Sequence, residues 1–185
     1  MKKVAVLLAD GFEEIEALTV VDILRRDRVY VDTVSITEDY IVHGAHGINV
    51  QTEDLFEEVN FAEFDMVVLP GGLPGTTHLN EHEGVRRVVK DFADNGKFVG
   101  AICAAPSILG GMGLLKGKRA ACYPTVEDKL LGAVIMKMPV VRDGNIITGR
   151  GMGTAIEFAL KLTEVLMGRE DAEEIADSIL FTGKI

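Results

Sequence analysis

The sequence has few cysteines, few basic residues and no long apolar run, and each shortage argues against a class of protein. Two cysteines among 185 residues are too few for a disulfide framework or a four-cysteine zinc site. No segment approaches the roughly 20 consecutive apolar residues of a membrane span. Only 19 basic residues stand against 29 acidic ones, and the net charge of −10 argues against nucleic acid or an anionic membrane as a standing partner.

The apolar content is high enough for one substantial core. Apolar residues make up 48% of the chain, and a length of 185 residues fits a single domain over 1–185. Met1-Lys2-Lys3 and the apolar run after it resemble the start of a signal peptide. Asp10 and Glu13 interrupt that run, however, and no cleavage pattern follows. We therefore expect a cytoplasmic protein.

Short apolar runs alternate with amphipathic segments along the chain. This pattern predicts strands over 3–9, 29–36, 65–69, 98–103 and 119–123, and hairpins over 40–52 and 140–147. It predicts helices over 13–26, 83–95, 106–111, 124–129, 155–167 and 171–180. In the first helix we expect Ile15, Leu18 and Val21 to face the core. Strands and helices in this order indicate an α/β sandwich with a mainly parallel sheet.

Three predicted strands end in residues that suit a binding site. They are followed by Asp10-Gly11, by Pro70-Gly71-Gly72 and by Cys103. Ligands of such folds bind beyond the carboxyl ends of the parallel strands, where these segments meet. Two glycines after a strand let backbone N–H groups point at an anion, although a plain turn explains the pair equally well.

Cys103 lies where a buried strand is expected to turn into a helix. Small residues follow it, and Pro106 is tolerated in the first turn of a helix. This is the geometry of a nucleophile elbow, which exposes the side chain and aims the next backbone N–H, that of Ala104, at a ligand. A helix N-terminus also favours thiolate over thiol. A buried, inert cysteine is the alternative interpretation of this stretch.

Three glutamates stand near the start of the first helix. For Glu13 and Glu14 we accept a simple role, because carboxylates near a helix N-terminus complement the helix dipole. Glu16 is different if it contacts Cys103. A thiolate and an ionised carboxylate repel each other, so the pair should share one proton and titrate as a unit.

Four motifs together resemble a known family. They occur in order over nearly the whole chain: Asp10-Gly11-Phe12-Glu13-Glu14-Ile15-Glu16, Val67-Val68-Leu69-Pro70-Gly71-Gly72, Ala101-Ile102-Cys103-Ala104-Ala105-Pro106 and Arg150-Gly151-Met152-Gly153-Thr154-Ala155. The chain resembles the ThiJ/PfpI superfamily, on the branch of Parkinson disease protein 7. The resemblance implies a flavodoxin-like sandwich and a homodimer. The activities that it implies are glutathione-independent glyoxalase, deglycation of early methylglyoxal adducts, redox sensing and chaperone action.

The resemblance also implies roles for single residues. Cys103 matches the reactive cysteine, and Glu16 matches the glutamate that hydrogen-bonds it. Gly72 and Ala104 match the residues whose N–H groups form an anion pocket, and we include Gly71 of the same turn. Arg150 belongs to a further motif and is a candidate for the surroundings of the site.

The chain departs from the family pattern at three positions. Tyr123 stands where many relatives place a histidine, and a phenol with an unperturbed pKa of about 10 cannot serve as a neutral base at pH 7. Ala104 replaces the histidine of the peptidase branch, so protease activity is not expected. His46 replaces an arginine near the dimer interface of close relatives. A class I glutamine amidotransferase would need a catalytic histidine that the sequence does not place.

Two functions remain open. The first is a cysteine enzyme that acts on small α-oxoaldehydes such as methylglyoxal or on glycated protein. The second is a redox-responsive or chaperone-like protein that uses the same Cys103 without catalysis.

We expect Cys122 to be a core residue rather than a resolving thiol. We also expect no metal and no cofactor, because the histidines lack convincing ligand spacing; they are His43, His46, His78 and His82.

Overall fold

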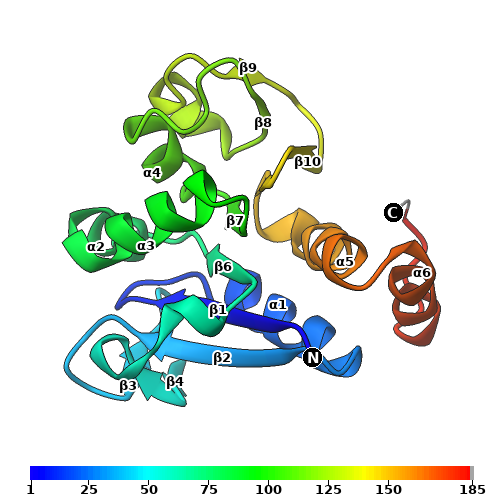
Figure 1. The fold of residues 1–185 in the computed structure, drawn as a ribbon, viewed down its shortest axis with the longest axis horizontal. Coiled ribbons are helices and arrows are strands. Elements are labelled where there is room, and N and C mark those ends of the chain that lie inside the picture. Colours follow the sequence, from blue (N-terminus) through cyan, green and yellow to red (C-terminus); the bar gives the residue numbers. More distant parts are fainter. Residues whose placement is uncertain (184–185) are drawn as a thin grey trace.

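The computed structural model, which describes residues 1–183, has a seven-stranded sheet at its centre (Figure 1). The strand order is β10-β11-β7-β6-β1-β2-β5, and neighbours are parallel except β10, which runs antiparallel to β11. The strands are β1 (Lys3–Leu8), β2 (Tyr30–Ser35), β5 (Asp54–Leu55), β6 (Met66–Leu69), β7 (Phe98–Ile102), β10 (Val140–Asp143) and β11 (Ile146–Gly149). Strands β1, β2, β6, β7 and β11 follow the 2-1-3-4-5 order of flavodoxin-like sheets, which confirms the predicted fold class.

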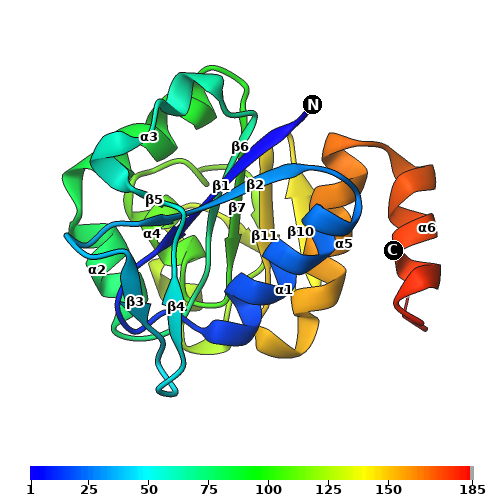
Figure 2. The ribbon, with the colours of Figure 1, turned by 90° about the horizontal axis from the view of Figure 1, so that it is seen from below.

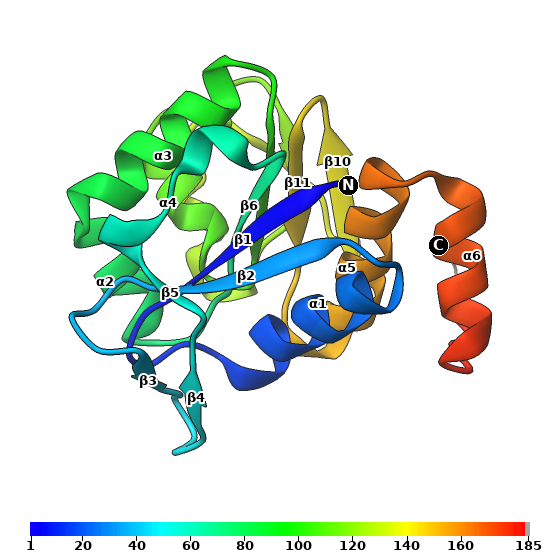
Figure 3. The same cartoon turned by 60° about the horizontal axis from the view of Figure 1, so that its bottom comes forward.

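Helices cover both faces of the sheet. Helices α1 and α5 lie on one face, α2, α3 and α4 lie on the other (Figure 3), and α6 lies outside α5 (Figure 2). Their bounds are α1 (Glu14–Arg26), α2 (Gly75–Glu81), α3 (Glu83–Asp94), α4 (Pro106–Gly111), α5 (Ala155–Leu166) and α6 (Arg169–Ser178). No helix within residues 1–183 is long and apolar enough to cross a membrane.

The core has two halves, one on each side of the sheet. Val4, Val6 and Leu8 of β1 pack beneath α1 and α5, while Ala5 and Leu7 pack beneath the other helices, and all five are fully buried. Successive strand residues point to opposite faces, so a strand covered on both sides is apolar at every position. The continuous apolar run at the start of the chain has this cause.

Most of the predicted elements are present with small shifts at their ends. The hairpin expected over 40–52 consists of β3 (Ile41–His43) and β4 (Asn49–Gln51), which pair antiparallel outside the main sheet. Short 3-10 turns are η1 (Phe56–Glu58), η2 (Phe61–Glu63), η3 (Pro124–Lys129) and η4 (Met152–Thr154). Helix α2 was not predicted, because Leu79 is its only large apolar residue and the segment therefore has no helical periodicity.

The strand predicted over 119–123 is wrong beyond its first two residues. Only β8 (Arg119–Ala120) is a strand, and it pairs with β9 (Val134–Ile135) in a separate two-stranded sheet. The next backbone groups find other partners. The N–H of Ala121 donates to Oγ1 of Thr148 at 2.9 Å, and the N–H of Tyr123 donates to the carbonyl of Cys103 at 2.8 Å.

The inward face of α1 also differs from the prediction. Val21 is buried, but Ile15 and Leu18 are exposed by 51% and 36%. The first turn instead buries Glu14 and Glu16, which are both below 3% exposed. Because two acidic side chains point inward there, the apolar residues beside them are directed to solvent.

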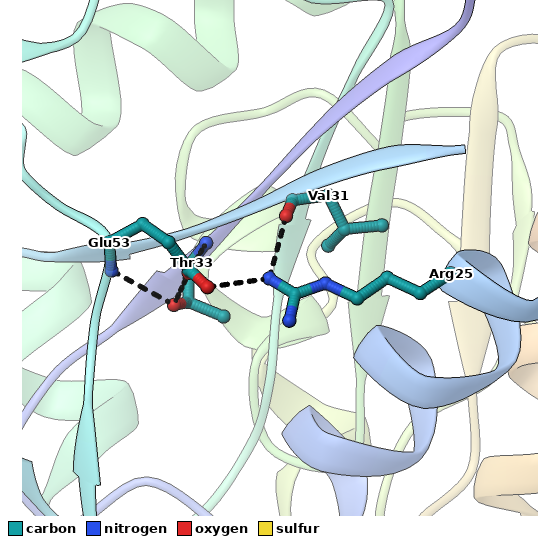
Figure 4. A network of polar contacts seen from close by, with 4 residues as sticks. All are labelled: Arg25, Val31, Thr33 and Glu53. Carbon is teal, nitrogen blue, oxygen red and sulfur yellow. Dashed lines mark hydrogen bonds and ion pairs between the residues drawn. The ribbon is translucent and has the colours of Figure 1, made fainter. Parts of the chain in front are cut away.

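A polar network joins α1 to the outer edge of the sheet (Figure 4). Arg25 donates to the carbonyl of Val31 at 2.8 Å and to Oε1 of Glu53 at 2.7 Å. The other oxygen of Glu53 accepts from the N–H of Thr33 at 2.9 Å and from the Thr33 hydroxyl. The network ties Glu53, which directly precedes β5, to β2. Strand β5 is an edge strand of only two residues, so these side-chain contacts add to its short backbone pairing.

Candidate functional site

The carboxyl ends of three adjacent strands meet at one edge of the sheet. Strand β6 lies between β1 and β7, so the segments Asp10-Gly11, Gly71-Gly72 and Cys103 that follow these strands come together. Helix α1 begins directly after the first segment and brings Glu16 to the same place. The sequence prediction of a shared site at this edge therefore agrees with the topology.

Cys103 lies in a sharp turn between β7 and α4, as predicted. Its φ is +64°, a left-handed conformation that side-chain-bearing residues rarely adopt and that costs roughly 1–3 kcal/mol. The turn is held by two backbone bonds: the Cys103 N–H donates to the carbonyl of Gly149 at 3.0 Å, and its carbonyl accepts from Tyr123 at 2.8 Å. The side chain is only partly buried. Strain of this kind at an accessible thiol is typical of a nucleophile elbow.

Glu16 is buried beside this thiol. Its Oε2 accepts a hydrogen bond of 2.8 Å from the N–H of Gly71, whereas its Oε1 is buried without a hydrogen-bond partner of ordinary geometry. Both groups pack directly against the backbone of Gly71, since a Cβ on it would lie 2.6 Å from Cβ of Cys103 and 2.6 Å from Oε2 of Glu16. The closeness of carboxyl and sulfur therefore depends on the absence of a side chain at Gly71.

The Glu16 carboxyl and the Cys103 thiol are close enough to perturb each other's pKa. Burial raises the pKa of Glu16 to about 7, although the thiol and the Gly71 N–H act to lower it. Burial, followed by the charge of Glu16, raises the pKa of Cys103 to about 12. The helix N-terminus was expected to lower this thiol pKa, and burial together with the adjacent carboxyl outweighs that effect. The pKa of the thiol lies above that of the carboxyl, so the proton of the pair favours the sulfur and can pass to Glu16.

Two backbone N–H groups act on the sulfur, and Gly71 is not one of them. The N–H groups of Ala104 and Gly72 both lower the pKa of Cys103 by hydrogen bonding. Gly72 has a φ of +91°, which a glycine adopts without strain. The inclusion of Gly71 in the anion pocket is wrong, because its N–H is taken by Glu16.

Tyr123 and Arg150 lie near the site without forming part of the Cys103–Glu16 pair. Tyr123 supplies its backbone N–H to the Cys103 carbonyl, while its side chain is 47% exposed. Arg150 faces Glu127, with Nη1 at 3.6 Å from Oε1, and both atoms are buried without a hydrogen-bond partner.

Cys122 is fully buried, and burial raises its pKa to about 11. It is a free core cysteine, although no strand contains it.

His46 lies in the turn of the β3–β4 hairpin and meets the start of α1. Its Nδ1 is 2.9 Å from Oε2 of Glu14 and 3.5 Å from Oε2 of Glu13. The simple dipole role expected for Glu14 is therefore incomplete, because this buried carboxylate also anchors the hairpin. This contact could not be predicted from the sequence, since the histidine and the glutamate are 32 residues apart.

An open groove of about 510 Å³ is lined by Ala104, the residue that follows Cys103. Thr76 of α2, Ser107 of α4 and Val126 of η3 also line it. The Thr76 hydroxyl is buried without a hydrogen-bond partner. The groove therefore lies beside the residue after the nucleophile, and Cys103 itself does not line it.

Comparison with known proteins identifies the family. The family model described as DJ-1/PfpI family matches residues 2–165. Protein DJ-1 homolog B of Arabidopsis thaliana is 38% identical over 97% of this chain and 41% of its own length. The chain spans less than half of that relative and of Protein DJ-1 homolog A from the same plant.

Two further relatives match over most of both chains. The glutathione-independent glyoxalase DJR-1.2 of Caenorhabditis elegans is 35% identical over 88% of this chain and 87% of its own. The structure of oxidized DJ-1 from Toxoplasma gondii superposes with a TM-score of 0.95 at 35% identity, covering 99% of this chain and 100% of that one. The chain belongs to the DJ-1/PfpI family.

Proposed function

We propose that this protein is a cysteine-dependent enzyme that converts α-oxoaldehydes such as methylglyoxal, or their early protein adducts, without glutathione. The observation that carries the proposal is the thiol of Cys103, held in a strained turn between the Gly72 and Ala104 N–H groups and the buried carboxyl of Glu16. The similarity to a relative named as a glutathione-independent glyoxalase supports the same class of substrate.

The reaction begins when the Glu16 carboxylate takes the proton of the Cys103 thiol and the resulting thiolate attacks the aldehyde carbon. A carbon–sulfur bond forms, and the aldehyde oxygen becomes an oxyanion that the N–H groups of Gly72 and Ala104 stabilise. Glu16 holds the proton of the pair and delivers it to this oxygen, which gives a neutral hemithioacetal. Glu16 is then ionised and available as a base.

The second half moves two protons and adds one water. The Glu16 carboxylate removes the hydrogen from the former aldehyde carbon and returns it to the neighbouring carbonyl carbon, while the hydroxyl proton of the hemithioacetal passes to the oxygen of that carbonyl. This transfer oxidises the first carbon to a thioester and reduces the second to an alcohol, so that no external oxidant is needed. Water cleaves the thioester, releases a 2-hydroxy acid and restores the Cys103–Glu16 pair with its proton.

Glu16 takes the acid–base role that a histidine has in many cysteine enzymes. Tyr123 stands at the corresponding position, contributes its backbone to the turn and exposes its phenol. A carboxyl whose pKa is raised to about 7 by burial is suited to give and take a proton near neutral pH.

Product analysis after addition of methylglyoxal tests the proposal. We expect the wild type to form lactate, Cys103→Ala to form none above the uncatalysed rate, and Cys122→Ala to keep the wild-type rate. Equal lactate formation by the wild type and Cys103→Ala would remove Cys103 from the reaction.

A redox-responsive or chaperone-like protein that uses the same cysteine is the second candidate. It is favoured by the side chain at Tyr123, which supplies no neutral base. Mild peroxide should then convert Cys103 to a sulfinate, which the Gly72 and Ala104 N–H groups would stabilise. Mass spectrometry distinguishes this product from a Cys103–Cys122 disulfide, which would instead support a resolving role for Cys122.

We also propose a cytoplasmic homodimer that uses the outer face of α1. Ile15 and Leu18 expose apolar surface there, and exposed apolar patches often mark interfaces. Ile15→Lys should weaken the dimer in sedimentation equilibrium. Met138→Lys, at a residue 49% exposed outside α1, should not. A wild-type monomer at all concentrations would contradict this part.

A further inference from the structure

Three metal-binding side chains from two distant segments converge beside the start of α1. Glu13 and Glu14 come from the turn into that helix, and His46 comes from the β3–β4 turn. One ligand atom of each side chain lies within 4.8 Å of those of the other two. The Nδ1 of His46 is 2.9 Å from Oε2 of Glu14 and 3.5 Å from Oε2 of Glu13.

These separations fit the edges of a coordination polyhedron. Zinc binds imidazole nitrogen at about 2.0–2.1 Å and carboxylate oxygen at about 2.0–2.2 Å. Two ligand atoms on one such ion are therefore roughly 3.0–3.5 Å apart in tetrahedral or octahedral geometry. The 3.5 Å distance lies at this spacing, and the 2.9 Å distance, which is that of a direct hydrogen bond, would lengthen slightly when an ion enters.

The buried carboxylate of Glu14 is already oriented for this task. Its Oε1 accepts from the N–H of His46 at 2.7 Å and from the N–H of Ile48 at 3.4 Å. Oε2 is thereby turned toward the imidazole and toward Glu13. Ligating carboxylates in metal sites are commonly held in this way by hydrogen bonds to their other oxygen.

The charge of the cluster is not balanced by the protein alone. Within residues 1–183, His46 is the only cationic side chain that pairs with Glu13 or Glu14. Even a protonated imidazole cancels only one of the two negative charges, and the side chain of Glu14 is only 3% exposed. A divalent cation would neutralise both carboxylates.

We propose that Glu13, Glu14 and His46 bind one divalent transition-metal ion, with Zn²⁺ as the best match to one imidazole and two carboxylates. Water fills the remaining positions on the solvent side. The ion would clamp the β3–β4 turn to the start of α1. It would also lie next to the turn after β6, because the Glu13 N–H donates to the carbonyl of Gly71 at 2.9 Å.

Calorimetric titration of the chelator-treated protein with Zn²⁺ tests the site. We expect close to one ion per chain in the wild type and a loss of affinity of at least 10-fold in Glu13→Gln. His46→Arg should abolish binding, because a guanidinium still donates to the Glu14 carboxylate but cannot ligate a metal. His43→Gln changes a histidine of the same hairpin and should bind like the wild type.

Two further measurements separate this site from the thiols and from misfolding. Cys103→Ser should keep the full stoichiometry, and Co²⁺ should give visible d–d bands without thiolate charge transfer. Circular dichroism establishes that Glu13→Gln and His46→Arg are folded. Absence of Zn²⁺ binding in the wild type, unchanged binding in folded His46→Arg, or loss of binding in Cys103→Ser would each overturn the proposal.

Discussion

The backbone N–H of Gly71 donates a 2.8 Å hydrogen bond to Oε2 of Glu16 and so fixes the carboxyl beside the Cys103 thiol. The two residues are 55 positions apart. Gly71 has two functions here, because it supplies the donor and also leaves the space that Cys103 and Glu16 occupy.

Gly71→Ala should disable the site. The new Cβ would lie 2.6 Å from both Cβ of Cys103 and Oε2 of Glu16, so these groups must move apart. We expect lactate formation to fall by at least about 100-fold and the free energy of unfolding to fall by about 1–3 kcal/mol.

Gly111→Ala is the matched control for that substitution. Its Cβ would meet open space at the end of α4, so turnover should be unchanged and stability should change by less than about 1 kcal/mol. Lactate assays and urea unfolding of both variants provide the measurements. Wild-type turnover in Gly71→Ala would contradict the close packing of the three residues.

Glu16→Gln should separate proton transfer from hydrogen bonding. Glutamine can still accept from the Gly71 N–H and donate to sulfur, but it cannot transfer a proton. Turnover should therefore fall by about 10²–10⁴-fold. Glu83→Gln, in the first turn of α3, should cost at most about 1 kcal/mol of stability and leave turnover unchanged. Equal rates in Glu16→Gln and the wild type would remove Glu16 from the mechanism.

Cys103 should react with alkylating agents long before Cys122 does. Cys103 is partly exposed in its turn, whereas Cys122 is fully buried. Limited iodoacetamide treatment of the native protein, read by mass spectrometry, should modify Cys103 almost exclusively. Equal modification of the two cysteines before unfolding would argue that the turn does not present the thiol as described.

Asp32 should contribute a decrease in the free energy of unfolding as the pH rises from about 4 to about 7. Burial, then its contacts with Asp54 and Glu53, raises the pKa of Asp32 to about 7, whereas an unfolded aspartate has a pKa of about 3.9. The folded state therefore binds the extra proton in this interval, and its contribution to stability is lost as the pH rises through 7.

Asp32→Asn separates the effect of Asp32 on stability from that of Glu16, whose pKa is also raised to about 7. The amide stays neutral at every pH, so the variant should match the wild type near pH 4 and exceed its free energy of unfolding by about 2 kcal/mol at pH 8. Urea unfolding at both pH values is the measurement. A variant that is less stable than the wild type at pH 8 would show that the charged form is the favoured one.

Local features of the sequence were sufficient for the fold class and for the position of the nucleophile. Strand and helix periods of 2 and 3.6 residues are local, so the alternation of elements and the turn at Cys103 could be predicted. The segment over 121–123 could not be predicted in the same way. Its backbone partners, Thr148 and Cys103, are 20 or more residues away.

Tertiary structure alone decided where the polar side chains of α1 point. Ile15 and Leu18 have the spacing of core residues, yet they are exposed because Glu14 and Glu16 find buried donors from His46 and Gly71. A buried carboxylate is stable only where such donors compensate the loss of water. Those donors come from segments more than 30 residues away, so the sequence determined which groups were available and the fold determined which of them met.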